Sequence, residues 1–280
     1  NTMNARLLFI LLLFTIGALW YIIGYWRRKA GEAAFAAARL TEKSEERERY
    51  CRLAVMAGHR KACRMFCLLH PERFDGHSPH KPFKLRGIRI SFYGYYYPSR
   101  YNALLNDEQK AFCHSIYQFK QGDIHGIEFF KTCMNALQLK KRPYHIMFMP
   151  CSNWIKYGQR FKRLDWYIGK HRQDLTSGLY DVDICDARES LHEAKGGEKR
   201  ILERNYLITG KIKGKEIIII DDVLTTGQSV VDYKEEIERC GGKVVAAIFY
   251  GKTLSMPSML LVQIHVWGNH IAHIIERMTK

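Results

Sequence analysis

The stretch KEIIIIDDVLTTGQSVVDYKEEIERCGG, residues 215–242, runs in the order strand, acidic pair, small polar loop, helix and glycine pair. Its Ile217–Ile220 run is β-branched and uniformly apolar, which is typical of a strand buried on both faces of a parallel sheet. Asp221 and Asp222 then emerge at the carboxyl end of that strand, where open α/β sheets bind their ligands. The stretch therefore predicts a ligand site on a Rossmann-like α/β fold.

The loop after the acidic pair predicts a phosphate site. It offers successive backbone N–H groups and three hydroxyls at the start of a helix, from Thr225, Thr226, Gly227, Gln228 and Ser229. A helix N-terminus binds phosphate through these free N–H groups and its dipole. The carboxylates would repel an anion, so they should face sugar hydroxyls or a metal-bound group. A sugar phosphate satisfies both halves, whereas the GxxxxGK[ST] and GxGxxG nucleotide loops are missing.

The same architecture is indicated on either side of this stretch. From Tyr144 onward, apolar strand runs (HIMFM, EIIIID, KVVAAIFYG) alternate with helical segments, as in a parallel sheet. Before it, KLRGIRISFYGYYYPSR (84–100) is strand-like, and a helical segment from Asp107 through Leu139 is interrupted around Gly122.

The segment IIIIDDVLTTGQS resembles the phosphoribosyl-diphosphate (PRPP) signature of type I phosphoribosyltransferases. Within that superfamily the chain is most similar to the ComF-like, competence-related group, over roughly Tyr93 to Thr253. Three further stretches carry the likeness: IYQFKQGDIHGIEFF with Lys120 and Gly122, MPCSNWIKYGQRF at 149–161, and ERNYL with Arg204 and Asn205. The family's RGFNQ motif is matched only loosely by KYGQRF, and its zinc ribbon has no counterpart here.

The resemblance implies a role for each part of the site. Asp221 and Asp222 would be the catalytic pair that binds the ribose 2′- and 3′-hydroxyls, and Thr225–Ser229 would bind the 5′-phosphate. Backbone N–H groups of Cys151, Ser152 and Asn153 would bind the diphosphate, with added charge from Lys156 and Arg160. Mg²⁺ would be chelated mainly by the substrate diphosphate, so no metal-ligating side chain is expected. The reaction implied is transfer of ribose 5-phosphate.

The acceptor is not identified by any side chain. Purine-salvage members of the superfamily carry an aspartate just before the TG of the loop, where this chain has Thr225 and Thr226, so purine salvage is disfavoured. The hood that selects the acceptor should come from residues 163–204 and from the Tyr93–Tyr97 stretch.

The N-terminal part predicts a single-pass membrane anchor. Leu7–Trp26 is twenty residues without a charge, enough to span roughly 30 Å as a helix. Arg27, Arg28 and Lys29 follow at once and outweigh Arg6, which places the C-terminal domain in the cytoplasm. A cleaved signal peptide and a buried core helix are the alternatives, but the positive cluster follows a full-length span rather than preceding a short one.

The domain limits expected are an anchor at residues 1–30, a helical module at 31–73, and a phosphoribosyltransferase-type domain at 74–280. The module should contain two helices that break near Gly58, and it resembles one tetratricopeptide-like unit. One unit cannot bury its own faces, so it must pack on another part of the protein, on the membrane or on a partner.

The charge and the cysteines limit the partners. Lys+Arg 44 against Asp+Glu 28 gives +16, which implies an anionic partner: phosphate esters, nucleic acid or an acidic membrane. The eight cysteines form no CxxC pair, which favours a reducing compartment and buried thiols at Cys51, Cys63 and Cys67. We interpret the three histidines of the C-terminal segment as surface or helix-face residues rather than ligands: His265, His270 and His273.

Two other functions remain open at this stage. One is a non-catalytic sensor of a phosphoribosyl ligand. The other is a ComF-like factor that handles single-stranded DNA, for which Tyr95, Tyr96, Tyr97 and Trp154 would supply stacking faces. The sequence indicates no oligomeric state.

Overall fold

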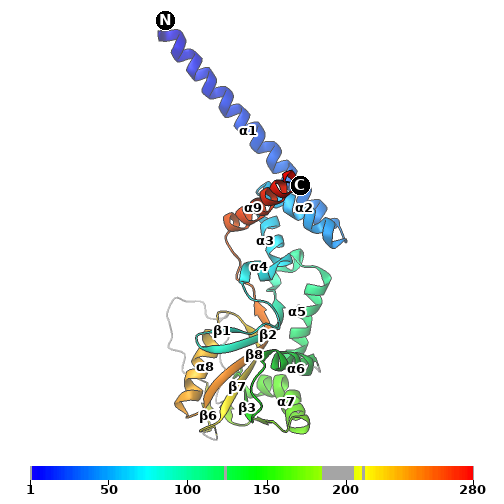
Figure 1. Cartoon of the computed structure of the whole chain (residues 1–280), viewed down its shortest axis with the longest axis vertical. Coiled ribbons are helices and arrows are strands. Elements are labelled where there is room, and N and C mark those ends of the chain that lie inside the picture. The colour runs from blue at the N-terminus through cyan, green and yellow to red at the C-terminus, as the bar shows by residue number, and fades with distance from the viewer. Residues whose placement is uncertain (1, 123–124, 185–204, 210–211, 280) are drawn as a thin grey trace. The chain divides into compact units, whose positions relative to one another are not determined.

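The computed structural model describes residues 2–122, 125–184, 205–209 and 212–279, and it contains two compact units (Figure 1). The sheet unit comprises Gly76–Asn102 and Asn106–Leu254, and the helical unit comprises Asn1–Asp75, Ala103–Leu105 and Ser255–Lys280. The N-terminal limit of the sheet unit lies beside the predicted limit at residue 74. At the other end the two differ, because the chain after Leu254 joins the helical unit.

Six strands form the main sheet, in the order β1-β2-β8-β7-β3-β4. Their bounds are β1 Phe83–Leu85, β2 Ile88–Tyr96, β3 Tyr144–Phe148, β4 Leu175–Ser177, β7 Glu216–Leu224 and β8 Lys243–Thr253. Only β1 and β2 pair antiparallel in this sheet; every other neighbouring pair is parallel. A separate antiparallel pair is formed by β5 (Val182–Ile184) and β6 (Tyr206–Ile208). The predicted, mostly parallel α/β sheet is confirmed.

Helices cover both faces of the sheet (Figure 1). On one side lie α5 (Asp107–Lys120), α6 (His125–Leu137) and α7 (Trp154–His171), and α8 (Gln228–Arg239) lies on the other; a short 3-10 helix, η1, spans Ser99–Leu104. The core on the first side joins alternate strand residues, such as Phe148, Ile218 and Ile220, to buried aromatic side chains of the helices. The predicted interruption near Gly122 is the gap between α5 and α6.

The strand order determines where a ligand can enter. After β3 the chain passes through α7 to β4, whereas after β7 it passes through α8 to β8 on the opposite side. The connections that leave β3 and β7 therefore run in opposite directions from the carboxyl ends of these two neighbouring strands. Ligands of open α/β sheets bind at such switch points.

Five helices form the helical unit: α1 Thr2–Leu40, α2 Ser44–Met56, α3 Arg60–Leu69, α4 Pro71–Asp75 and α9 Met259–Met278. The predicted break near Gly58 lies between α2 and α3. Helix α1 continues ten residues beyond the expected limit of the anchor at residue 30, because Gly31, Phe35 and Ala38 bury one side of it. Within the described residues, one helix segment, Ile10–Leu40, is long and apolar enough to cross a bilayer.

The module finds its packing partners inside the chain. Helix α2 packs on α1 and α3, and α9 packs on both α2 and α3. Cys51, Cys63 and Cys67 are buried free thiols in this unit, as predicted, and burial raises the pKa of Cys51 and Cys67 to about 12.

The C-terminal histidines lie on α9. The ring of His265 packs against Phe74, whereas His270 and His273 are exposed on the helix surface.

Candidate functional site

The acidic pair lies in β7, which extends beyond the end of its neighbour β3. The last register pair between β3 and β7 joins Phe148 to Ile220, and the Met149 N–H donates to the Ile220 carbonyl at 2.9 Å. Beyond that point β7 continues beside β8 alone as far as Leu224. Asp221 and Asp222 are therefore inside the strand rather than after it, because β8 extends far enough to pair with them. On their other flank β3 has already ended.

Two cations contact this pair. Asp222 follows Ile218 and Ile220 on the face covered by α5 and α7, because alternate residues of a strand share a face. Its Oδ2 lies 3.1 Å from Lys120 Nζ at the end of α5 and 3.0 Å from Arg160 Nη1 on α7. The same Arg160 nitrogen lies 3.5 Å from Asp221 Oδ1.

The two carboxyl groups differ in acidity. Burial and the adjacent charge of Asp222 raise the pKa of Asp221 to about 8, although Arg160 opposes this effect. Burial acts on Asp222 in the same direction, but Arg160 and Lys120 together hold its pKa below the usual value. At neutral pH the pair therefore carries about one negative charge beside two positive ones. This balance suits a site that must bind an anion.

The predicted phosphate loop joins β7 to α8. Gly227 is the N-cap of α8 with φ +79°, and no side chain caps the helix. The four flanking side chains, Thr225, Thr226, Gln228 and Ser229, are exposed. The left-handed backbone at position 227 favours glycine, and a Cβ there would lie 2.2 Å from Leu85 Cδ2, so the Leu85 side chain would have to shift. The Gln228 N–H donates to Thr226 Oγ1 in a long bond of 3.4 Å, and the N–H groups that follow it in the first turn of α8 are the ones available to a ligand.

Arg86 joins this loop, although no sequence pattern pointed to it. It lies in the turn between β1 and β2, and its Nη1 donates to Gln228 Oε1 at 2.7 Å. Gln228 in turn donates to Asp232 at 2.6 Å. A guanidinium therefore lies next to the open start of α8. The two residues are 142 positions apart in sequence, so only the pairing of β2 with β8 brings them together.

The loop after β3 is built differently. The Asn153 side chain caps α7 by accepting from the Lys156 N–H at 2.9 Å, and Lys156 itself is exposed. Asn205 Nδ2 donates to the carbonyls of Cys151 (3.1 Å) and Ser152 (3.4 Å), which fixes the loop. The neighbour of Asn205 in the resemblance, Arg204, lies outside the described residues.

Cys151 is a buried thiol. Burial raises its pKa to about 12, which disfavours the thiolate form that a nucleophile needs.

The structure thus brings Asp221, Asp222 and Arg160 into direct contact and adds Lys120, which the resemblance singled out without assigning it to the site. The two loops flank this cluster from neighbouring strands. Residues 185–204 of the predicted acceptor hood lie outside the described residues.

The proposed stacking surface needs a correction. Tyr95 and Tyr97 are each only 5% exposed, so they offer no free ring face to a nucleic-acid base. Tyr95 is held by its hydroxyl, which donates to the His77 carbonyl. Trp154 stays 38% exposed, beside Tyr157 and Tyr180.

Comparison with known proteins finds similarity over part of the chain. An orotate phosphoribosyltransferase from Sulfolobus acidocaldarius is 42% identical over 57 residues, which are 20% of this chain and 26% of that protein. The match therefore spans about a quarter of the curated relative. Residues 173–253 match the family model of the phosphoribosyl transferase domain, and this range contains β7 with its acidic pair, the loop after it and α8.

Proposed function

We propose that this chain is a membrane-anchored phosphoribosyltransferase-type protein that binds PRPP with Mg²⁺ and transfers ribose 5-phosphate to an acceptor. One observation carries the proposal. An acidic pair that two cations contact is followed by a helix start whose N-cap residue is a glycine, and both lie within the range that matches the phosphoribosyl transferase domain. Sugar hydroxyls and a phosphomonoester are the two groups that such a pair and such a helix start bind.

The bound substrate would use both loops. The N–H groups of Thr225–Ser229 would donate hydrogen bonds to the 5′-phosphate, and the two carboxyl groups would accept hydrogen bonds from the ribose hydroxyls. The loop at Cys151–Asn153 would face the diphosphate, with Lys156 on the first turn of α7. Arg160 and Lys120 keep the local charge positive, which stabilises a diphosphate leaving group.

The chain fits a metal that the substrate itself chelates. In the described part of the chain, no group of three or more His, Cys, Asp or Glu side chains is arranged to hold an ion. The nearest carboxyl groups, Asp221 and Asp222, already contact cations. Mg²⁺ bound mainly by diphosphate and water would neutralise the leaving group without further ligands from the chain.

The finer parts of the proposal concern family and topology. The stretches around Lys120, Cys151–Arg160 and Asn205 favour a protein close to the ComF-like group. Arg27, Arg28 and Lys29 follow the apolar segment of α1, which favours a cytoplasmic sheet unit.

The test uses the full chain in detergent micelles. We expect PRPP to raise the melting temperature in the presence of Mg²⁺, to raise it less without the metal, and to release diphosphate slowly. Ribose 5-phosphate should give a smaller shift, because it reaches only one of the two loops. If millimolar PRPP with Mg²⁺ causes no shift, the proposal fails. Stabilisation without diphosphate release in the presence of an acceptor panel would instead support a phosphoribosyl sensor.

A further inference from the structure

Helix α9 carries a continuous apolar stripe that faces outward. Six side chains recur at intervals of four and three residues, which places them on one side of the helix. Each is between 41% and 81% exposed: Leu260, Ile264, Trp267, Ile271, Ile274 and Met278. A stripe of this length is uncommon on a solvent-facing helix.

The opposite side of α9 is the one that packs on its own unit. Val262 and Val266 are buried, and both lie across the helix from the stripe. From Trp267 to Thr279 every residue is exposed. The packing of α9 on α2 and α3 thus turns the apolar side away from the unit, so another surface must cover it.

Helix α9 begins at the level where the apolar segment of α1 ends. Gln263 Nε2 donates to the Val55 carbonyl at 3.4 Å, and Arg27 Nη2 donates to the next carbonyl, that of Met56, at 3.1 Å. Arg27 is the first charged residue after Leu7–Trp26. These contacts hold the start of α9 beside the predicted boundary between bilayer and water.

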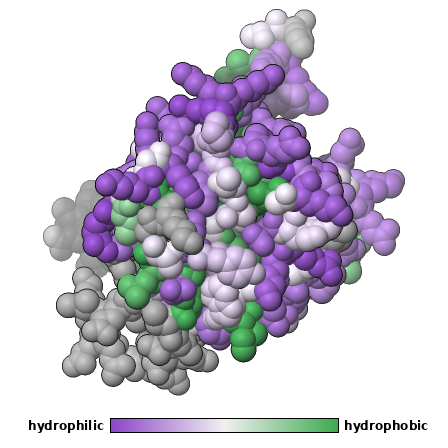
Figure 2. All heavy atoms as spheres, turned by 90° about the horizontal axis from the view of Figure 1, so that it is seen from below, coloured by the Kyte–Doolittle hydropathy of each residue, from purple (hydrophilic) through white to green (hydrophobic). Residues whose placement is uncertain are grey.

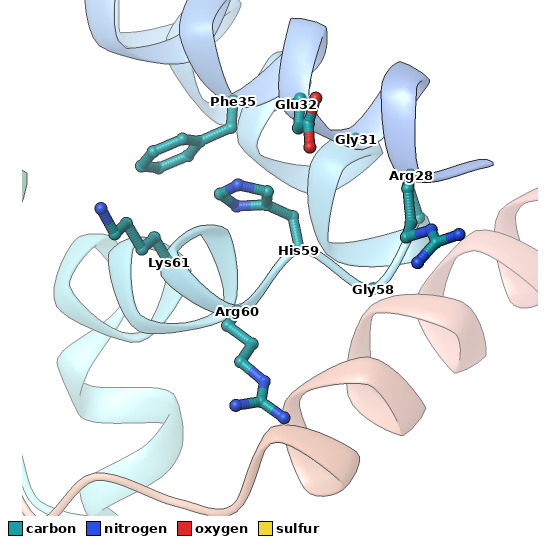
Figure 3. Close-up of a pocket in the computed structure, with 9 residues that line it drawn as sticks. Arg28, Gly31, Glu32, Phe35, Gly58, His59, Arg60 and Lys61 are labelled. Atoms are coloured by element: carbon teal, nitrogen blue, oxygen red, sulfur yellow. The ribbon is translucent and has the colours of Figure 1, made fainter. Parts of the chain in front are cut away.

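Positive charge surrounds this boundary. A cavity of about 510 Å³ between α1 and the start of α3 is lined by three cations, Arg28, Arg60 and Lys61, and by one carboxylate, Glu32 (Figure 3). Figure 3 shows Arg28 and Lys61 on either side of the stacked rings of Phe35 and His59. Among the described residues none of these three cations forms an ion pair. The nearby carboxylate, Glu32, pairs instead with Lys29 at 3.3 Å.

The occupant that fits both features is a bilayer with anionic headgroups. Such a surface offers acyl chains to the stripe and phosphates to the unpaired cations. The stripe of α9 also lies next to the exposed apolar surface of α1, because α9 begins beside the end of the apolar segment Leu7–Trp26. By contrast, the molecular face seen in Figure 2 is mostly hydrophilic, and its apolar residues form small separate groups.

We propose that α9 lies in the headgroup region of an anionic membrane, with its stripe toward the acyl chains and the basic boundary against lipid phosphates. The proposal rests on the membrane anchoring by α1 put forward above, but not on any ligand of the acidic pair.

The experiment places the full chain in phosphatidylcholine vesicles, with or without about 30% phosphatidylglycerol. Flotation of the vesicles reports the anchor, and quenching of tryptophan emission by brominated lipids reports α9. Comparison with Trp267→Phe isolates Trp267, because the other tryptophans are common to both proteins. We expect the Trp267 contribution to be quenched, and more strongly in the anionic vesicles. A floating protein whose Trp267 is not quenched would overturn the proposal for α9 alone, whereas absence of flotation would overturn the anchor as well.

Paired variants separate the two features. Ile271→Gln with Ile274→Gln should lower the hydrogen-exchange protection of 267–279 in vesicles at least tenfold, whereas Leu207→Gln, at an exposed site of the sheet unit, should not. Arg60→Gln with Lys61→Gln should remove the dependence on phosphatidylglycerol, whereas Lys140→Gln with Lys141→Gln should preserve it. Inorganic phosphate at 10 mM should not compete if the lipid surface is the ligand; competition would identify a free-anion site and overturn the lipid assignment. Cross-linking of two chains through α9, with Trp267 unquenched, would show that a second copy covers the stripe.

Discussion

The loops after β3 and β7 occupy equivalent places on neighbouring parallel strands, yet their helices begin differently. Asn153 caps α7 with its side chain, whereas α8 begins at Gly227 without any side-chain cap. The Asn153 side chain accepts from the Lys156 N–H at 2.9 Å, whereas at α8 the Gln228 N–H makes only a longer bond of 3.4 Å to Thr226 Oγ1, which leaves the other donors of that first turn available. The phosphate should therefore bind at α8, while the loop before α7 depends on its backbone and on nearby cations.

Removing the carboxylates between the two loops should have the largest effect. Asp221→Asn with Asp222→Asn should weaken PRPP binding by at least about 100-fold, because the ribose loses the charge-assisted hydrogen bond to the ionised Asp222 and the hydrogen bond to Asp221. Calorimetric titration measures the loss, and circular dichroism checks that the protein remains folded. Glu235→Gln, on the exposed side of α8, is the control. Unchanged affinity in the double variant would remove the acidic pair from the site.

The next effect concerns the uncapped helix start. Gly227→Ala should weaken PRPP binding at least tenfold and lower the melting temperature, because its Cβ collides with Leu85 at a left-handed backbone position. Gly214→Ala is a matched control: its φ is +76°, but nothing lies within 4 Å of the added Cβ. The control should lose stability alone. Equal affinity for PRPP in the two variants would contradict phosphate binding at α8.

The capped start provides the opposite test. Asn153→Ala should cost about 1 kcal/mol of folding stability, measured by urea unfolding. Asn153→Asp preserves the cap but adds a negative charge, so it should weaken PRPP binding several-fold more than binding of ribose 5-phosphate. Equal losses for the two ligands would mean that the loop after β3 does not face the diphosphate.

Arg86 should make a smaller contribution at the α8 side. Arg86→Gln should reduce affinity for ribose 5-phosphate about two- to fivefold and make it less dependent on salt, as expected for an exposed cation. Lys84→Gln, in the same hairpin, should have no comparable effect. If both variants lose affinity equally, Arg86 contributes only to the overall positive charge of the hairpin and does not contact the phosphate.

The smallest effect is one of pH on stability. The folded chain holds the Asp221 proton up to about pH 8, whereas an unfolded aspartate releases it near pH 4. Between these values, rising pH favours the unfolded chain. Asp221→Asn removes this contribution, so the melting temperature of the variant relative to the parent should increase by a few degrees from pH 5 to pH 8 and then level off. A constant difference would show that Asp221 titrates normally.

The local parts of this site could be predicted because short-range chemistry determines them. A β-branched run, an acidic pair and a glycine at a helix start all lie within residues 215–229, and the break at Gly58 follows from its neighbours alone. The contacts of Lys120 and Arg160 could not, because they depend on where α5 and α7 end over the sheet. The true length of β7 depends likewise on β8, which follows it in the chain.

The outward-facing apolar stripe of α9 could not be predicted from the sequence, for a related reason. Its apolar spacing predicts an amphipathic helix, but whether the apolar side faces the protein or the outside depends on which side of α9 is packed. Two buried valines on the opposite side reveal that the stripe faces outward.

The close contact at Gly122 has a further consequence. Its φ is +86°, and a Cβ there would lie 2.4 Å from the Gln159 carbonyl, so the end of α5 touches the backbone of α7 one residue before Arg160. Lys120 lies two residues from this contact and Arg160 one residue from it. The packing of Gly122 on Gln159 therefore fixes the distance between the two cations. The positive charge around Asp222 is thus maintained by helix packing, and damage to that packing would reach the ligand without altering any residue that touches it.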